Sequence, residues 1–403
     1  MTQGERPRLS GTNLERAADH NQRVTLQAIR VGGALTRVDL ARITGLTAPA
    51  IANITRRLTE DGLIEEAGQR RGGRGQPPTN LRVRRDACYS IGINIDRDHV
   101  TVVLVDFAGQ VLARKSVEVD FALPDQVRSL YRKSIKTMLR QANVESSKLV
   151  GLGVAVPDDL GSVSLPGRPA GYAAWEGLDV AELFAEPLPL RVFVENDAAA
   201  AALGEMQLGL GQRYNSFFYI LISAGLGGGF VLDGNYVRGA NGRSGELGFM
   251  SASVETGQRE QVQKLVSLSG LAEYLARHGF GVAALRDEAP PPDFARCLDG
   301  WVEQAAHRLC TPLDAINCLI NPSVVLIGGR LPRQVVERLA QRLNAIIRDA
   351  TDAPSIARVE RAALSEDAPA VGAAILPFSH FLLPKLGALW KASTPNGDVM
   401  PAD

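Results

Sequence analysis

Residues 191–205 read RVFVENDAAAAALGE, and they contain both a strand pattern and a helix pattern. RVFVEND, at 191–197, is expected to be a strand, and Asp197 opens an alanine-rich helix. Three polar side chains, Glu195, Asn196 and Asp197, stand at the expected end of this strand. A helix cap by Asp197 would explain one of them and leaves the other two unexplained. The stretch therefore indicates an α/β domain with a candidate ligand site at a strand end.

Strand and helix patterns on either side of this stretch form two similar halves. Before it, strands are expected at 90–95, 99–107, 111–121 and 148–156, and a helix from about Pro124 to Asn143. After it, strands are expected at 216–223, 228–234 and 323–329, and long helices around 258–279 and 294–320. Two such halves imply two lobes with a cleft between them, which is a common position for a ligand.

Two glycine-rich loops fall in the second half. SAGLGGG, at 223–229, follows an expected strand, and such a loop exposes backbone N–H groups to a phosphate or a sugar. GANGRSGELG, at 239–248, carries one carboxylate, Glu246. A glycine-rich turn alone is explained equally well by a hairpin, so neither loop identifies a ligand by itself.

Composition excludes several classes of protein. The chain has 403 residues, 43.1 kDa, 45% hydrophobic and 22% charged residues, which is typical of a globular protein with two or three domains. No apolar run reaches the roughly 18 residues that span a bilayer. The polar first residues, MTQGERPRLS, indicate no secretory signal, so a cytoplasmic protein without membrane partners is expected.

Metal ligands are not spaced as in a metal site. The five histidines are scattered, and the four cysteines form no CxxC pair: Cys88, Cys297, Cys310 and Cys318. Buried structural thiols are the expected role for these cysteines, and neither a disulfide framework nor a cysteine-based zinc site is expected.

The first 86 residues differ in charge from the remainder. They hold 15 Arg, no Lys and 9 acidic residues, a net charge of +6, while the whole chain has a net charge of zero. The remainder is therefore at −6. A small arginine-rich segment on a mildly acidic body suggests a polyanion partner for this segment.

Three short helices are expected within the basic segment. Residues 21–31 have helical apolar spacing. Thr36, with Asp39 three residues later, forms a capping-box pattern that starts a second helix. The inner face of this second helix is expected to be Leu40 and Ile43.

The third helix completes a helix-turn-helix pattern. Thr47 is expected to cap it, and Ile51, Ile54 and Leu58 are expected to be its buried stripe. In a helix-turn-helix this helix lies in the major groove of DNA, where Asn53 would pair with adenine and arginines would contact phosphates. The DNA-contacting residues expected in these helices are Thr36, Thr47, Ala48, Pro49, Asn53, Arg56 and Arg57.

A loop between two expected strands follows the third helix. GQRRGGRGQPPTN, at 68–80, places Arg71 and Arg74 among glycines, as in a wing whose arginines enter a narrow minor groove. A flexible linker remains an alternative interpretation of this loop. For the whole segment, a small packing domain with a solvated arginine face is the alternative to DNA binding.

Three blocks in this order resemble the ROK family of repressors, open reading frames and kinases. VENDAAAAALGE, at 194–205, is similar to the family block END-A-N-A-A-A-x-G-E. Residues 223–250 resemble its block G-T-G-x-G-G-G…G-A-x-G-x-A-G-E-x-G-H. Residues 317–329 resemble its block N-x-x-x-P-x-x-I-x-x-G-G. The resemblance runs from about residue 13 to residue 375, and the N-terminal segment is similar to that of the family's repressors of sugar-use genes.

The resemblance implies a fold and a site. The expected fold is α/β, with an N-terminal winged helix-turn-helix at 1–86 and a two-lobed, actin-like ATPase (ribonuclease H-like) ROK domain. Its lobes would be 87–200 and 201–403, with the C-terminal helix returning towards the first lobe. A sugar effector in the cleft would contact Asn196, Asp197, Gly225 and Glu246.

The chain departs from the family's kinases in the stretch that binds ATP. The family pattern D-x-G-G-T corresponds to Asn94-Ile95-Asp96-Arg97-Asp98, in which both glycines and the threonine are replaced. Two carboxylates at the phosphate position predict no ATP binding and no kinase activity, hence no cofactor. Asp197 matches the family's general base and would instead accept a hydrogen bond from a sugar hydroxyl.

The chain also departs from the family's zinc site. Phe249 stands at the position of the family's histidine ligand, and residues 250–275 contain no cysteine. Metal binding is therefore excluded on ligand count. The local fold near 250–268 is left open, and Asp158 and Asp159 are expected to alter the cleft rim.

These observations predict a sugar-responsive repressor of carbohydrate uptake or catabolism genes. Its partners would be operator DNA and a sugar or sugar derivative, and it would be a homodimer or homotetramer. Three alternatives stay open: a ROK sugar kinase with an added DNA-binding domain, a regulator whose effector is another protein, and a transcriptional activator.

Overall fold

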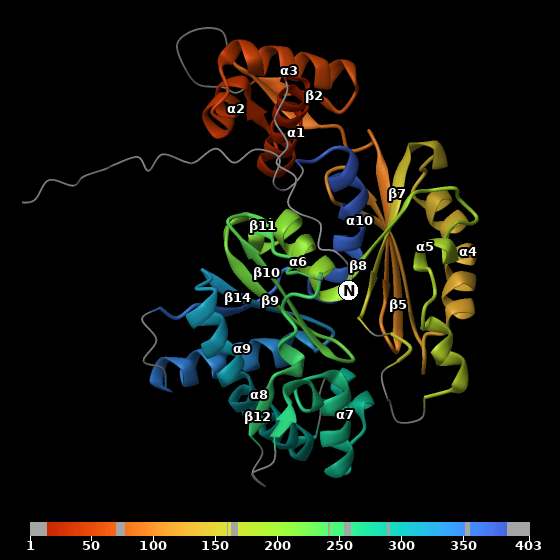
Figure 1. Ribbon diagram of the computed structural model, residues 1–403, viewed down its shortest axis with the longest axis vertical. Helices are drawn as coiled ribbons and strands as arrows, with labels where there is room; N and C mark the ends of the chain where they lie inside the picture. The colour runs from red at the N-terminus through yellow and green to blue at the C-terminus, as the bar shows by residue number, and fades with distance from the viewer. Residues whose placement is uncertain are drawn as a thin grey trace, which may run out of the picture. The chain divides into compact units, whose positions relative to one another are not determined.

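The computed structural model describes two compact units of the chain (Figure 1). The N-terminal unit holds the described residues up to Val83 together with 382–384, and the body is Arg84–Phe381. The described residues are 14–69, 77–158, 160–162, 168–240, 242–253, 259–287, 291–350 and 355–384. Among these residues, no helix has the length and apolar character needed to cross a membrane.

The N-terminal unit is a winged helix. Its helices are α1 (Leu14–Gly32), α2 (Arg37–Thr44) and α3 (Ala48–Glu60). Its strands are β1 (Leu35–Thr36), β2 (Ile64–Gln69) and β3 (Thr79–Val83), in an antiparallel sheet of order β1-β3-β2. The core is made of side chains from every helix and two of the strands: Leu26, Ile29, Leu40, Ile51, Leu58, Ile64, Leu81 and Val83.

Two predicted core positions of the N-terminal unit are wrong. Ile43, expected to face inward, is 54% exposed, because the short α2 turns only Leu40 fully into the core. On α3 the fully buried stripe is Ile51, Thr55 and Leu58, and Ile54 is only half-buried. The Thr55 hydroxyl donates to the Ile51 carbonyl at 2.8 Å, so its burial leaves no polar group unsatisfied there.

The first lobe of the body is a mixed sheet with helices on both faces. Its strands are β4 (Tyr89–Ile95), β5 (His99–Asp106), β6 (Val111–Glu118), β7 (Leu149–Val156) and β8 (Val192–Asn196), in the order β6-β5-β4-β7-β8. Figure 1 shows α4 (Pro124–Gln141) and α5 (Val180–Leu183) on one face and α10 (Ala368–Phe381) on the other. Every residue of β4 and β5 is buried, because both faces of the sheet are covered.

The second lobe is built in the same way. Its strands are β9 (Phe217–Ile222), β10 (Leu226–Leu232), β11 (Asn235–Tyr236), β14 (Val324–Gly329) and β15 (Arg358–Arg361), in the order β11-β10-β9-β14-β15. One face packs against α8 (Pro292–Leu319) and α9 (Arg333–Ala350), and the other packs against α6 (Asp197–Leu208). Helix α10 covers the first sheet, and α6 packs against both α10 and the second sheet. The two sheets therefore share one helical layer.

Small residues allow α6 and α10 to lie close together. A Cβ atom on Gly372 would lie 1.7 Å from the carbonyl oxygen of Ala200, and one on Gly204 would lie 2.9 Å from that of Ala368. The alanine run of α6 thus forms a contact surface on two sides of this helix, one towards α10 and one towards the second sheet. The expected lobe division between residues 200 and 201 falls inside α6, which is continuous there.

The long helix expected around 258–279 is wrong. The structure has β12 (Ser251–Ser253) paired with β13 (Arg259–Gln261), followed by a short α7 (Leu268–Arg277). The Ser267 hydroxyl accepts the Gly270 N–H at 3.0 Å and starts α7 there. Apolar spacing alone did not separate the strand from the helix.

Candidate functional site

A cavity of about 370 Å³ lies between the two lobes of the body. All four side chains or backbone positions expected to bind a sugar border it: Asn196, Asp197, Gly225 and Glu246. They come from the β8–α6 junction, from the turn after β9 and from the loop before β12. The fold thus brings together residues that the sequence analysis took from three separate motifs.

The β8–α6 junction uses its three polar residues differently from the expectation. Asn196, and not Asp197, is the N-cap residue of α6, because its Oδ1 accepts the N–H groups of Ala198 and Ala199 at 2.9 and 3.1 Å. Asn196 also lines the cavity, and its side-chain oxygen is already used by the two N–H groups of α6. Glu195 is buried in an ion pair with Arg238.

Asp197 lies at the wall of the cavity and is 8% exposed. One carboxylate oxygen, Oδ1, accepts the Ala198 N–H at 2.8 Å. Burial, and then the negative charge of Asp96, raise the pKa of Asp197 to about 7. Near neutral pH this group therefore exists in both protonation states, so it can accept a hydrogen bond from a hydroxyl or donate one.

Glu246 is held at the cavity by an arginine. Its Oε1 accepts from Nε of Arg243 at 3.0 Å, and the same nitrogen lies 3.5 Å from the Asp158 carboxylate. Phe249, at the position of the family's histidine, also lines the cavity and is 49% exposed. An exposed aromatic ring at a polar cavity offers an apolar surface to one face of a ligand.

The glycine-rich segment at 223–229 is only partly a loop. Leu226 to Gly229 belong to β10 and pair with β9, so the turn is limited to Ser223–Gly225. A Cβ atom on Gly228 would lie 2.6 Å from the Gly245 carbonyl oxygen, which explains this glycine by packing against the second glycine-rich loop. The prediction of an extended backbone cradle was therefore too broad.

The turn between β4 and β5 packs against Ser223–Gly225, the part of the glycine-rich segment that is a turn. Asp96 is buried, and its Oδ2 accepts the Ala224 N–H at 3.3 Å. The Arg97 guanidinium lies 3.5 Å from the position that a Cβ atom on Gly225 would take. A phosphate approaching this turn would meet a carboxylate already bound to the N–H group.

Sequence reasoning missed some cavity residues. Arg97 was noted only as a lost glycine, and Gln261 and Gln263 were not singled out, yet all three line the cavity. Glutamines in the segment that replaces the family's cysteines carried a weak signal, since they add polar groups next to Phe249. The described residues contain no group of three His, Cys, Asp or Glu side chains placed to hold a metal ion.

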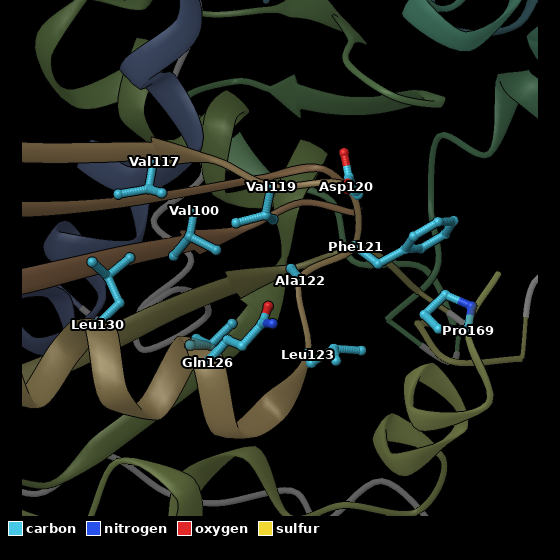
Figure 2. Close-up of a pocket in the computed structure, with 11 residues that line it drawn as sticks. Val100, Val117, Val119, Asp120, Phe121, Ala122, Leu123, Gln126, Leu130 and Pro169 are labelled. Carbon is cyan, nitrogen blue, oxygen red and sulfur yellow. The ribbon is translucent and has the colours of Figure 1, made fainter. Parts of the chain in front are cut away.

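A second hollow, of about 520 Å³, lies in the first lobe between the sheet edge and α4 (Figure 2). Figure 2 shows Val100, Val117, Val119 and Leu130 around it, with Phe121 at one end. Asp120 and Gln126 are the two polar side chains in its lining and the other lining residues are apolar, so this hollow suits a polyol less well than the cavity at Asp197 does.

The residues expected to contact DNA lie mostly on one exposed surface of α3. Six of them are exposed there: Thr47, Ala48, Pro49, Asn53, Arg56 and Arg57. Arg56 is paired with Glu60 at 2.8 Å. Thr47 occupies the N-cap position of α3, but its hydroxyl makes no capping hydrogen bond to this helix, which the structure describes throughout. Arg71 and Arg74 lie outside the described residues.

Thr36 is not placed to contact DNA. It is 3% exposed, its hydroxyl accepts the Asp39 N–H at 3.2 Å, and its own N–H and hydroxyl donate to the Asp39 carboxylate at 3.1 and 2.8 Å. The capping box was correctly predicted, and it uses the polar groups that a phosphate contact would need.

Two family models match the chain. The ROK family model matches residues 90–379, which is most of the body. A winged helix-turn-helix DNA-binding model matches residues 19–65. The two matches fall in the two compact units separately.

Three curated relatives match at 24–30% identity. Uncharacterized protein y4fQ of Sinorhizobium fredii is 30% identical over 366 residues, 89% of this chain and 90% of that protein. The xylose repressor of Bacillus spizizenii is 27% identical over 57% of this chain and 60% of the repressor. The DNA-binding transcriptional dual regulator NagC of Escherichia coli is 24% identical over 62% of this chain and 61% of the regulator. The matches to the two regulators thus span about three fifths of their length.

Solved structures share the fold. A ROK family transcriptional regulator, a homologue of the Escherichia coli MLC protein, superposes with a TM-score of 0.65 at 21% identity, covering 90% of this chain and 96% of the other. A ROK family glucokinase from Streptomyces griseus, in complex with glucose and AMPPNP, has a TM-score of 0.54 at 22% identity over 72% of this chain and 98% of the kinase. The regulator's match extends over more of this chain than the kinase's match does.

Proposed function

The chain belongs to the ROK family, and on this premise we propose that it is a cytoplasmic, sugar-responsive repressor of carbohydrate uptake or catabolism genes. The observation that carries the proposal is the presence, in one chain, of a winged helix-turn-helix and of a cavity bordered by Asn196, Asp197, Gly225 and Glu246. The names of its relatives, a xylose repressor and an N-acetylglucosamine repressor, support a sugar as effector. The proposal has three parts, a DNA-binding domain at 1–86 and two lobes at 87–200 and 201–403, although α6 runs across the division between the lobes and 382–384 group with the N-terminal unit.

The cavity residues would bind the sugar through complementary polar groups. Asp197 would accept from one hydroxyl or donate to it, and the amide N–H groups of Asn196 would donate to the next. Glu246, oriented by Arg243, would accept from a further hydroxyl. The exposed Phe249 ring would lie against an apolar face of the sugar.

The α3 surface would read the operator. Asn53 would contact a base edge in the major groove, and Arg57 would contact a phosphate. Arg71 and Arg74 would enter the minor groove from the wing. A homodimer, or a tetramer made of two dimers, would place two such helices on half-sites one or more helical turns apart.

The sugar would release DNA by selecting one lobe arrangement. A ligand shifts a conformational equilibrium only by its difference in affinity for the two states. The sugar must therefore bind the DNA-free arrangement more tightly, and the operator must in turn weaken sugar binding by the same factor.

Fluorescence anisotropy tests this proposal. The full-length protein is titrated onto labelled intergenic DNA from beside its own gene, with D-xylose, D-glucose, N-acetyl-D-glucosamine and their phosphates as added compounds. Release of the DNA by one compound at stoichiometric occupancy supports the repressor. Tighter binding in the presence of a compound indicates an activator, and tight DNA binding that no compound changes argues for a protein effector.

A sugar kinase is the second candidate. It is favoured by Asp197, whose pKa of about 7 suits a general base near neutral pH. It is opposed by Asp96, whose carboxylate holds the Ala224 N–H where a phosphate would bind. We infer that kinase activity is lost, and a coupled ADP-release assay with ATP and the same sugars decides this. Turnover above 1 s⁻¹, which is roughly the lower range of enzymes, would contradict the inference.

A further inference from the structure

Two segments of the first lobe meet the second lobe beside the cavity. The β4–β5 turn carries Asp96 and Asp98, and β6 ends at Glu118. The Asp96 carboxylate accepts the Ala224 N–H of the second lobe at 3.3 Å. Arg330, which follows β14 in the second lobe, completes a group that we call the Arg330 cluster: Asp96, Asp98, Glu118 and Arg330.

Backbone geometry directs Arg330 towards the first lobe. Gly329 ends β14 with a φ of 108°, and a Cβ atom there would lie 2.1 Å from the Ile222 carbonyl oxygen. The Arg330 N–H donates to that same carbonyl at 2.9 Å. The start of the side chain is therefore fixed to the end of β9 in its own lobe.

The guanidinium group then reaches three carboxylates of the other lobe. Its nitrogens lie 2.5 Å from Asp98, 3.9 Å from Asp96 and 3.8 Å from Glu118, and the side chain is 14% exposed. Burial and the neighbouring Asp96 charge raise the pKa of Asp98, and Arg330 opposes this rise. Without Arg330, three carboxylates would face one another in a half-buried site, so its loss leaves repulsion and not only a missing bond.

The Arg330 cluster shares residues with the cavity. Asp96 lines the cavity, and so does the adjacent Arg97, which lies over Gly225. The Asp96 charge also contributes to the raised pKa of Asp197 on the opposite wall. A change in the lobe arrangement at Arg330 would therefore change the shape and charge of the site where the sugar is proposed to bind.

We propose that Arg330 is a positioning residue that fastens the two lobes across the cavity and holds Asp96 on the Ala224 N–H. In doing so it stabilises one lobe arrangement, and the effector acts on that equilibrium. The fastening of the lobes is independent of the ligand. Its effect on sugar binding rests on the function proposed above.

Hydrogen exchange on the full-length protein tests the fastening without any ligand. Arg330→Met is compared with Arg333→Met, which changes an exposed arginine that lies three residues after Arg330 and is paired with Glu337. We expect exchange at 223–227 to be at least about tenfold faster in Arg330→Met, and unchanged in Arg333→Met, with α4 and α8 unaffected in both. Arg330→Lys should restore part of the protection, because an ammonium group retains the charge. Equal exchange in Arg330→Met and wild-type protein would overturn the proposal.

A milder variant covers the case in which Arg330→Met does not fold. Asp98→Asn removes the closest carboxylate and leaves Arg330 beside Asp96 and Glu118. It should raise exchange at Ala224 by a smaller factor, about threefold, while Asp125→Asn, on the exposed start of α4, should not. No acceleration in Asp98→Asn would overturn the proposal in that case.

The coupling to the effector is tested by operator release. D-xylose and N-acetyl-D-glucosamine are titrated against the operator complex of wild-type, Arg330→Met and Arg333→Met protein. We expect Arg330→Met alone to move the midpoint of release, by about tenfold. If neither sugar releases DNA from the wild type, the proposed function fails for these sugars while the exchange result stands. If the wild type responds and the midpoint of Arg330→Met is unchanged, the positioning role for the effector is overturned.

Discussion

The exposed surface of α3 and the cavity of the body are assembled in opposite ways. Asn53 and Arg57 belong to α3 and Thr47 is the N-cap residue of the same helix, so their common exposure depends on one short stretch of chain. The cavity takes Asp96, Asp197 and Glu246 from three segments up to 150 residues apart, so their proximity depends on the packing of both lobes. A site on one element tolerates changes elsewhere in the fold, whereas a site between lobes responds to them. This difference suits the first to recognition and the second to regulation.

The largest expected effect is on sugar binding at the cavity, and it should leave DNA binding by α3 unchanged. Asp197→Ala removes a charged hydrogen-bonding group from a buried wall, and we expect sugar affinity to fall by about 100-fold or more. Operator affinity without sugar should stay unchanged, because α3 is in the other compact unit. Anisotropy with and without sugar measures both quantities. Glu273→Ala, on the exposed face of α7, is the matched control, and a release midpoint in Asp197→Ala equal to that control would contradict the assigned role.

The next effect tests the α3 surface in the same assay. Asn53→Ala should weaken operator binding by about 1–3 kcal/mol and leave binding to unrelated DNA unchanged, because a base contact is lost. Thr59→Ala, exposed on the last turn of the same helix, should change neither. Equal losses on operator and unrelated DNA would show that Asn53 contacts no base.

A substitution in the loop at 70–76 has an expected effect of comparable size, and its two possible outcomes distinguish a wing from a linker. If the loop at 70–76 reads the minor groove, Arg74→Ala should cost about 1–3 kcal/mol of operator affinity. If the loop is a linker, Arg74→Ala should leave operator affinity unchanged. Competition between A·T-rich and G·C-rich operator flanks, measured by anisotropy, shows whether any loss comes from the minor groove.

A smaller effect distinguishes two neighbouring arginines of α3. Arg57→Ala should weaken binding to any DNA by about 1 kcal/mol and lower the salt dependence by about one counterion. Arg56→Ala should cost less, since the Arg56 guanidinium is already paired with Glu60 at 2.8 Å. Binding isotherms at four potassium chloride concentrations measure both slopes. A larger loss for Arg56→Ala would place the phosphate contact on the other arginine.

The smallest effect concerns stability and pH. The folded-state pKa of Asp197, about 7, lies above its ordinary value of 3.8, so between pH 4 and 7 the folded chain holds a proton that the unfolded chain has lost. The contribution of Asp197 to the free energy of unfolding therefore falls as pH rises through this window. In Asp197→Asn the free energy of unfolding should depend less on pH between pH 4 and 7, by a slope equivalent to up to about one proton. Urea unfolding at several pH values measures this, and parallel profiles for the two proteins would refute it.

Local patterns predicted most elements of the fold. The strands β4, β5, β7, β9 and β14 lie within one or two residues of the expected ranges, because continuous apolar runs bounded by turns are typical of buried strands. The capping box of Thr36 and Asp39 was likewise correct, since it depends on residues three apart. The segment from 258 to 279 was wrong because its hairpin is formed by pairing with β12, which the apolar spacing does not report.

The roles of the polar side chains were less predictable than their positions. The sequence indicated a ligand site at Asn196 and Asp197, and it considered a helix cap only at Asp197, whereas Asn196 is the residue that caps α6. It indicated a loss of ATP binding from Asp96, Arg97 and Asp98, without showing that Asp96 would take the Ala224 N–H. Thr36 was expected at the DNA surface and is buried, because its hydroxyl caps α2.

The sequence alone was enough for the family resemblance, for most of the strands of the two lobes, and for four residues that border the cavity, Asn196, Asp197, Gly225 and Glu246, because each of these is carried by a local pattern along the chain. Only the tertiary structure showed which polar groups are already satisfied and which face the cavity. It alone brought Arg330 to Asp98, 232 residues earlier, since a contact at that separation leaves no local pattern. The free energy of this contact depends on burial and charge in a space that the two lobes enclose together.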